Sequence, residues 1–154
     1  MHMIVYRIGR TKYADDLTGE GARLNGGRWN HKLTPCVYTS ESRALAVLEY
    51  TVNVNIDDIP RALSITTIEI PEEHILELTP PELPGDWRGA PAPASTKDFG
   101  TRLLKKAQFA AIKIPSAVIP DEYNFLLNPF HRQSAKFLVL NVEDFVYDIR
   151  IKTK

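Results

Sequence analysis

The fold class is decided by the stretch CVYTSESRALAVLEYTV (residues 36–52), in which a short strand leads directly into a helix. Residues 36–38 are mostly apolar and fit a strand, whereas the hydroxyl groups and the acid of residues 39–42 are typical of a helix start. Four apolar residues then recur at helical spacing and are expected to face the core: Ala44, Leu45, Leu48 and Val52.

The rest of the chain repeats this pattern of short strands and few helices. Further strands are expected at residues 3–8, 62–70, 109–114, 137–140 and 145–149, with a turn at 141–144. A second helix is expected after residues 95–98, and its buried face should carry Phe99, Leu103, Leu104 and Ala107. The order predicts an α+β fold with mixed or antiparallel sheets and a few helices, in a single compact domain spanning residues 1–154.

Proline is concentrated in one part of the sequence, with ten of the eleven prolines between Pro60 and Pro129. Five of them lie in residues 80–93, which therefore cannot form a helix interior or a central strand. The same stretch contains Leu83 and Trp87, so residues 79–94 are predicted to be an ordered loop packed on the domain rather than a linker.

Charge is balanced, with 19 Lys and Arg residues against 19 Asp and Glu residues. A dedicated DNA- or RNA-binding domain would carry a basic excess, so the chain alone is not expected to bind nucleic acid. The balance is uneven along the sequence, because residues 1–43 sum to +3 and residues 57–77 sum to −5. This unevenness fits either random surface scatter or an anion-binding segment near the N-terminus.

The sequence favours a cytoplasmic setting. The N-terminus is unlike a signal peptide, and no apolar run approaches the roughly 20 residues of a membrane helix. The single cysteine, Cys36, excludes an intramolecular disulfide and is interpreted as a core thiol.

Several kinds of chemistry have no signature in the sequence. The four histidines are not spaced for zinc, and there is no cysteine pair, so no metal is expected. The chain also lacks a phosphate-binding P-loop, a dinucleotide-binding Gly-x-Gly-x-x-Gly motif and a nucleophile elbow.

Three segments carry candidate chemistry, and the first is GGRWN (residues 26–30). Two glycines allow a ligand to approach the backbone closely, and Arg28 offers a planar fork that suits phosphate. Taken alone, the segment is better explained as a Gly-Gly turn with a surface arginine and an anchoring Trp29.

The second segment runs from Tyr38, at the end of a strand, to Glu49 on the following helix. Glu49 stands beside the apolar stripe of that helix, so it can line a cleft or pair with a surface cation. The third segment is IPSAVIP (residues 114–120), in which two prolines fix the ends of a short extended stretch. Ser116 is held between them, although a plain strand-end turn is also compatible with the pattern.

Together and in this order, the segments resemble the RES domain family, which is named for an Arg, a Glu and a Ser. The resemblance covers nearly the whole chain, and it gives Arg28, Glu49 and Ser116 as the name-giving residues. Ser134 is a second candidate for the serine but lacks the Pro-Ser-Ala context. The matching stretches are VYR (5–7), GGRWN (26–30), VYT (37–39), ALAVLE (44–49), LP (83–84) with Trp87, PSAV (115–118), and Asn124 with NP (128–129).

The resemblance implies a fold similar to that of ADP-ribosyltransferases and a role as the toxin of a bacterial type II toxin–antitoxin system. RES toxins deplete NAD⁺ by cleaving the nicotinamide–ribose bond through hydrolysis or phosphorolysis, or transfer ADP-ribose to a protein. The implied partner is a helix-turn-helix antitoxin of the Xre type. NAD⁺ is then a substrate, and neither a true cofactor nor a metal is implied.

The residues suit this chemistry. Cleavage of the N-glycosidic bond builds positive charge on the ribose, which a carboxylate such as Glu49 would stabilise. On the family match, Arg28 would hold the diphosphate, Tyr38 would stack on nicotinamide, and Ser116 would orient the carboxylate or a ribose hydroxyl. The remaining candidate NAD-binding residues are Arg7, Gly27, Trp29 and Asn128.

Two other functions remain open from the sequence. The chain could modify a cellular protein as a mono-ADP-ribosyltransferase, or it could be a non-enzymatic nucleotide-binding interaction module.

Overall fold

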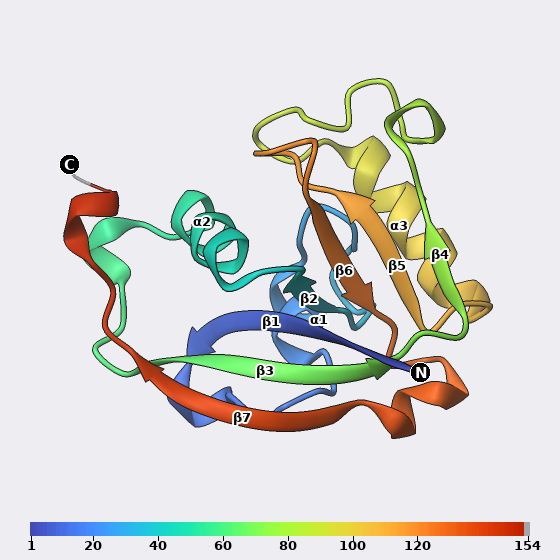
Figure 1. Cartoon of the computed structure of the whole chain (residues 1–154). Coiled ribbons are helices and arrows are strands. Elements are labelled where there is room, and N and C mark those ends of the chain that lie inside the picture. Colours follow the sequence, from blue (N-terminus) through green and yellow to red (C-terminus); the bar gives the residue numbers. More distant parts are fainter. Residues whose placement is uncertain (153–154) are drawn as a thin grey trace.

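One seven-stranded sheet runs through the molecule, in the order β4-β5-β6-β2-β1-β3-β7 (Figure 1). The computed structural model describes residues 1–152. Strands β4 and β5 are parallel and all other neighbours are antiparallel, so the sheet is mixed, as an α+β fold predicts. The strands are β1 (His2–Arg10), β2 (Val37–Ser40), β3 (Leu63–Pro71), β4 (Ile75–Glu77), β5 (Ala111–Pro115), β6 (Tyr123–Leu127) and β7 (Leu138–Phe145).

The sheet divides into two limbs at the β1–β2 junction. Strand β1 pairs with β3 over nine residues and β2 pairs with β6 over four, whereas Tyr6 and Ser40 are the single paired position between β1 and β2. The limbs β4-β5-β6-β2 and β1-β3-β7 therefore diverge, as Figure 1 shows. The opening between them creates the space in which the candidate site lies.

Residues 1–152 contain three α-helices beside the sheet: α1 (Glu20–Asn25), α2 (Arg43–Asn53) and α3 (Ala94–Lys106). Helix α2 begins as predicted after Ser42, whose hydroxyl accepts a hydrogen bond from the Leu45 amide at 3.1 Å. None of the helices in residues 1–152 is long and apolar enough to cross a membrane. Short 3-10 turns occur at Thr11–Tyr13, Ile56–Asp58, Pro80–Glu82, Arg132–Lys136 and Ile149–Ile151.

The buried face of α2 differs from the predicted one. Leu45 is buried and Leu48 is half-buried, but Ala44 is exposed and Val52 is 51% exposed. One side of α2 lies on the sheet and the other borders a cavity, which Val52 lines. The helical spacing therefore located the apolar positions of α2, but it could not predict which of them face the core and which face the cavity.

Two hydrophobic clusters lie on opposite faces of the sheet, because successive β5 residues belong to different clusters. The first is made by Val5, Val37, Ile68, Ile70, Ala110, Ala111, Phe125, Leu127 and Phe137. The second lies under α3 and is made by Trp29, Cys36, Leu78, Leu83, Trp87, Leu104, Ile112, Ile114 and Leu126.

The expected turn at residues 141–144 is wrong. Residues 138–145 form the continuous edge strand β7, which pairs with β3 across an irregularity between Thr67 and Ile68. The polar side chains at 141, 143 and 144 are exposed on this edge, so they do not interrupt the strand. The second expected strand, at 145–149, is replaced by an extended exit and a 3-10 turn.

The proline-rich loop packs on the domain, as predicted. Its first turn begins with a capping box formed by Thr79 and Glu82. Leu83 and Trp87 are buried in the cluster under α3. The loop is therefore an ordered part of the fold, and it reaches the opening between the two limbs.

Candidate active site

A cavity of about 910 Å³ lies where the two limbs of the sheet part. Its floor is formed by β1, β2 and β6, and α2 forms one wall. The loop at residues 26–29 and α1 form another wall, and the proline-rich loop lies over the space with residues 117–118. This volume is within the usual range for small-molecule sites.

Glu49 and Ser116, 67 positions apart in the sequence, meet at this cavity. The Ser116 hydroxyl donates a hydrogen bond to Glu49 Oε1 at 2.6 Å, and its oxygen accepts from the Val118 and Ile119 amides, each at 3.1 Å. Ser116 is fully buried, whereas Glu49 lines the cavity. The serine thus fixes one carboxylate oxygen from behind, and Glu49 Oε2 has no protein partner among residues 1–152.

Arg28 also lines the cavity, but one end of its guanidinium is bound to the proline-rich loop. Its Nη1 donates to the Trp87 carbonyl at 3.0 Å and to the Gly89 carbonyl at 2.7 Å. The GGRWN segment is further tied to α3 by Lys97, whose Nζ donates to the Gly27 carbonyl at 2.6 Å. Arg28 therefore connects the loop at residues 26–29 to the proline-rich loop, and its Nε and Nη2 have no protein partner among residues 1–152.

Tyr38 presents its ring to the cavity and holds the GGRWN loop with its hydroxyl. The hydroxyl donates to Asn30 Oδ1 at 2.6 Å and accepts from the Trp29 amide at 2.9 Å. Burial raises the pKa of Tyr38 well above its ordinary value, so the phenol stays neutral. A Cβ atom at Gly27 would lie 2.6 Å from this hydroxyl, which explains the glycine at that position.

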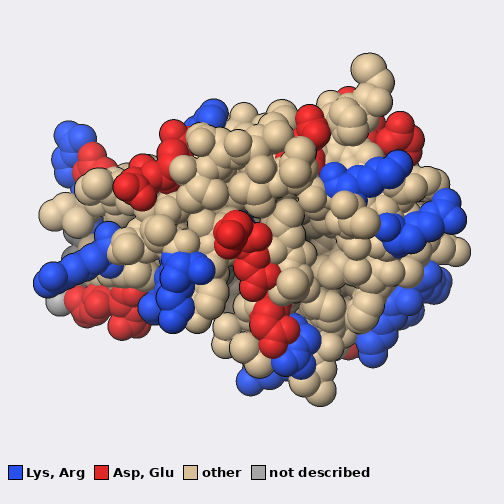
Figure 2. Space-filling view, turned by 90° about the horizontal axis from the view of Figure 1, so that it is seen from below, with Lys and Arg blue, Asp and Glu red and all other residues tan. Residues whose placement is uncertain are grey.

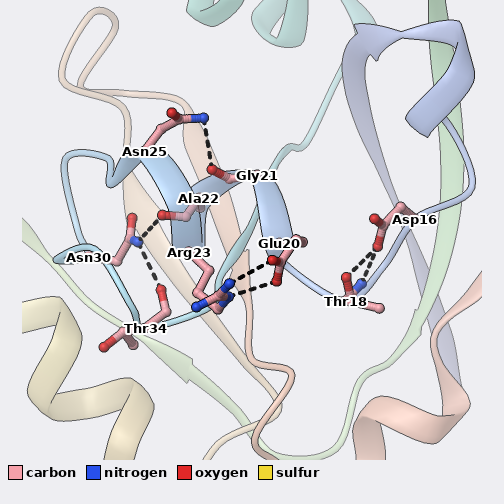
Figure 3. A network of polar contacts seen from close by, with 9 residues as sticks. All are labelled: Asp16, Thr18, Glu20, Gly21, Ala22, Arg23, Asn25, Asn30 and Thr34. Carbon is pink, nitrogen blue, oxygen red and sulfur yellow. Dashed lines mark hydrogen bonds and ion pairs between the residues drawn. The ribbon is translucent and has the colours of Figure 1, made fainter.

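The remainder of the GGRWN loop is fixed by a polar network that includes α1 (Figure 3). The fully buried Asn30 donates through Nδ2 to the carbonyls of Ala22 at 2.8 Å and Thr34 at 2.9 Å. Trp29 is only 3% exposed, and its ring packs edge-on against Phe99 at 6.0 Å. Trp29 therefore belongs to the core, although it is also one of the residues that line the cavity.

Two other predicted site residues use their polar groups inside the protein. Arg7 lines the cavity, but its guanidinium donates to the carbonyls of residues 13, 14 and 16, and burial lowers its pKa. Asn128 is fully buried and does not line the cavity. Its amide donates to the carbonyls of Leu104 at 3.0 Å and Phe109 at 3.2 Å, so it fastens the end of α3 to the strand that follows.

Asn124 lines the cavity but is not among the predicted site residues. Ser40 donates to its Oδ1 at 2.7 Å, and the amide Nδ2 has no protein partner in the described part of the chain. In the sequence, this residue was indicated only as part of the family match, together with residues 128–129, and no role was assigned to it. Tyr50, next to Glu49 on α2, lines the cavity as well and gave no separate signal.

The charges of the cavity lining are few and mostly positive. Three arginines, Arg7, Arg28 and Arg88, face one acid, Glu49. The surface elsewhere is mixed: in Figure 2, acidic side chains run down the middle of one face with Lys and Arg on either side of them. Within residues 1–152, no group of three or more His, Cys, Asp or Glu side chains is placed to hold a metal ion.

Proteins with named roles are similar to this chain over nearly its whole length. A relative called "Toxin Res" from Yersinia enterocolitica (serotype O:8 / biotype 1B) is 38% identical over 153 residues, covering 97% of this chain and 100% of the relative. The "Prs ADP-ribosylating toxin" of Sphingobium sp. (strain YBL2) is 36% identical, covering 94% of this chain and 92% of the relative.

A solved structure has the same fold. One chain in the crystal structure of the M. tuberculosis MbcT–MbcA toxin–antitoxin complex superposes with a TM-score of 0.74 at 19% identity. The superposition covers 94% of this chain and 85% of that chain. The RES domain family model matches residues 4–148. The chain therefore belongs to the RES domain family.

Proposed function

We propose that this protein is the toxin of a bacterial toxin–antitoxin system and that it cleaves the nicotinamide–ribose bond of NAD⁺. The observation that carries the proposal is the hydrogen bond between Ser116 and Glu49 at the wall of a cavity rich in arginine. The names of the relatives, "Toxin Res" and "Prs ADP-ribosylating toxin", support the same class of function.

The chemistry requires a fixed carboxylate. When the bond between the ribose C1′ and the nicotinamide nitrogen breaks, the electron pair leaves with nicotinamide and positive charge develops on the ribose. Glu49 would stabilise that charge because its carboxylate is held in place before the reaction begins. An oxygen of the acceptor, either water or phosphate, then forms the new bond to C1′ and loses its proton to solvent.

The other predicted contacts follow from the lining of the cavity. Arg28 would use Nε and Nη2 for the diphosphate, and the Tyr38 ring would stack on nicotinamide. Arg7, Gly27 and Trp29 stay predictions as secondary contacts. We do not include Asn128 in the proposed binding site, because its amide is used inside the fold.

The test is nicotinamide release by purified Glu49→Gln, which keeps the shape of the side chain and removes its charge. We expect turnover to fall by about 100-fold or more, as is common when an electrostatic stabiliser of a transition state is lost. Glu72→Gln is the matched control, because Glu72 is exposed and is not part of the cavity lining. Undiminished turnover in a folded Glu49→Gln protein would remove the basis of the assignment.

A second candidate activity is transfer of ADP-ribose to a protein. It is favoured by the similarity to the Sphingobium protein, whose name describes ADP-ribosylation. Labelled NAD⁺ mixed with cell lysate distinguishes the two activities, because transfer leaves label on a protein band. Binding of NAD⁺ without turnover, also in the presence of phosphate, would instead indicate a non-enzymatic nucleotide-binding module.

The proposed partner is a helix-turn-helix antitoxin of the Xre type. The presence of an antitoxin in the structure with the same fold supports a partner of this functional class. Coexpression of the chain with the product of a neighbouring helix-turn-helix gene tests it. A stable complex that suppresses NAD⁺ turnover is the expected result, and independent purification of the two proteins would contradict the proposal.

A further inference from the structure

Arg88, in the middle of the proline-rich loop, is a cavity residue that the sequence motifs do not single out. Its Nε donates to the Ala117 carbonyl at 3.0 Å, and its side chain lines the cavity. In the described part of the chain, Nη1 and Nη2 of Arg88 have no protein partner. The outer, forked end of this guanidinium is therefore available to a ligand.

The backbone around Arg88 is fixed by Arg28. The two carbonyls that Arg28 binds belong to Trp87 and Gly89, the residues immediately before and after Arg88. Trp87 is only 8% exposed, so its ring anchors the same point of the loop in the core. A side chain that starts from a fixed backbone loses less entropy when it binds, which favours a preorganised contact.

The Nε contact connects Arg88 to the residues that hold the carboxylate. Ala117 directly follows Ser116, which donates to Glu49 at 2.6 Å. Arg88 thus reaches across the roof of the cavity to the segment that orients Glu49. The guanidinium of Arg88 and the carboxylate of Glu49 therefore border the same cavity.

The charge of the cavity indicates what such a cation would bind. With three arginines against one glutamate, the lining carries a formal charge of +2 (three minus one). Both terminal nitrogens of Arg7 donate to carbonyl groups, so the guanidinium edges with two donors and no partner among residues 1–152 are those of Arg28 and Arg88. Paired guanidinium forks suit phosphate oxygens, and a dinucleotide diphosphate carries the compensating charge of about −2.

We propose that Arg88 binds a phosphate group in the cavity and that Arg28 positions it by holding the backbone on both sides. This inference rests on the proposed NAD⁺ activity and adds a residue to its substrate site. The phosphate belongs either to the diphosphate of the dinucleotide or to free phosphate that acts as the acceptor. The assay arms below separate these sources.

The experiment compares Arg88→Gln and Arg28→Gln, singly and combined, with Arg102→Gln as the control. Arg102 is exposed on α3, does not line the cavity, and its side chain has no hydrogen-bond or ion-pair partner among residues 1–152. Calorimetry with ADP-ribose measures diphosphate binding without turnover. Nicotinamide release over a phosphate titration measures acceptor binding.

If Arg88 binds the diphosphate, Arg88→Gln should weaken ADP-ribose binding by about 10- to 100-fold, the usual loss for a hydrogen bond to a charged group. If it binds free phosphate, ADP-ribose binding should be unchanged while the half-saturating phosphate concentration rises by a similar factor. In either case the combined variant should lose less than the product of the two single losses, because Arg28 acts partly through Arg88.

The proposal is overturned if Arg88→Gln matches the wild type in both measurements. If the loss in the combined variant equals the product of the two single losses, only the positioning role of Arg28 is overturned. A wild-type protein that neither binds ADP-ribose nor releases nicotinamide would instead overturn the proposed function, and this inference with it. The two failures are therefore distinguishable.

Discussion

Replacement of Ser116 by alanine tests most directly whether the fold holds Glu49 for catalysis. The Ser116 oxygen makes three hydrogen bonds: one to Glu49 Oε1 at 2.6 Å and two from the amides of Val118 and Ile119 at 3.1 Å. Ser116→Ala removes all three at a fully buried position. The change adds no bulk, so its effects come from the lost bonds.

The expected loss of stability follows from those contacts. A hydrogen bond to a charged group contributes about 1.5–3 kcal/mol, and each neutral bond about 0.5–1.5 kcal/mol. Water in the cavity can replace the hydroxyl at the carboxylate, so the two lost amide bonds set the effect, and the free energy of unfolding should fall by about 1–3 kcal/mol. Urea unfolding followed by circular dichroism measures this loss.

The expected loss of activity is separate from the loss of stability. If the hydroxyl orients Glu49 toward the developing charge, about 1.5–3 kcal/mol of transition-state stabilisation disappears, which is roughly 10- to 150-fold in kcat. Nicotinamide release under conditions where the variant is folded measures it. The KM for NAD⁺ should change less than kcat, because Ser116 lies behind the carboxylate and does not line the cavity.

Ser64→Ala is the matched control for a buried serine. Ser64 is 1% exposed and shares a hydrogen bond of 2.8 Å with the Thr11 hydroxyl, away from the cavity. It should cost about 1 kcal/mol of stability and leave kcat unchanged. A folded Ser116→Ala protein with kcat within about twofold of the wild type would refute the orienting role.

Two further predictions concern the framework of the fold. Gly100→Ala would place a Cβ 2.0 Å from the Trp29 carbonyl oxygen and should cost about 3 kcal/mol or more in urea unfolding, whereas Gly85→Ala, which has open space, should not. Burial lowers the pKa of His131, so the unfolded chain binds more protons and stability should fall as the pH drops below about 6.5. His131→Asn keeps an acceptor for the Gln133 amide but does not titrate in this range. Urea unfolding at pH 7 and pH 5 should therefore show a smaller acid loss of stability in His131→Asn than in the wild type, and an equal loss in both proteins would contradict the role of His131.

The sequence predicted local structure best where one segment carries its own signals. Ser42 caps α2 as expected, and the proline-rich loop packs through Leu83 and Trp87. Prediction failed where distant pairing decides the outcome. Residues 141–144 resemble a turn, yet pairing with β3 keeps them extended at the sheet edge.

The candidate site shows the same division between local and distant information. The motif segments indicated Arg28, Glu49 and Ser116, and the fold brings these segments to one cavity although Ser116 itself stands behind its wall. The sequence could not show that Arg28 binds carbonyls 59 and 61 positions away, because no local pattern encodes that contact. The same limit concealed Arg88, whose position depends on Arg28 and on Ala117.

The single paired position between β1 and β2 has a consequence for cooperativity. Each limb has its own backbone ladder, but Tyr6 and Ser40 alone join the ladders at the centre of the sheet. Local opening in native-state hydrogen exchange follows such weak boundaries between cooperative units. A ligand that contacts β1, β2 and α2 at once would connect the two limbs of the sheet, which few backbone hydrogen bonds join. Binding would therefore protect amides in both limbs, including those far from the ligand.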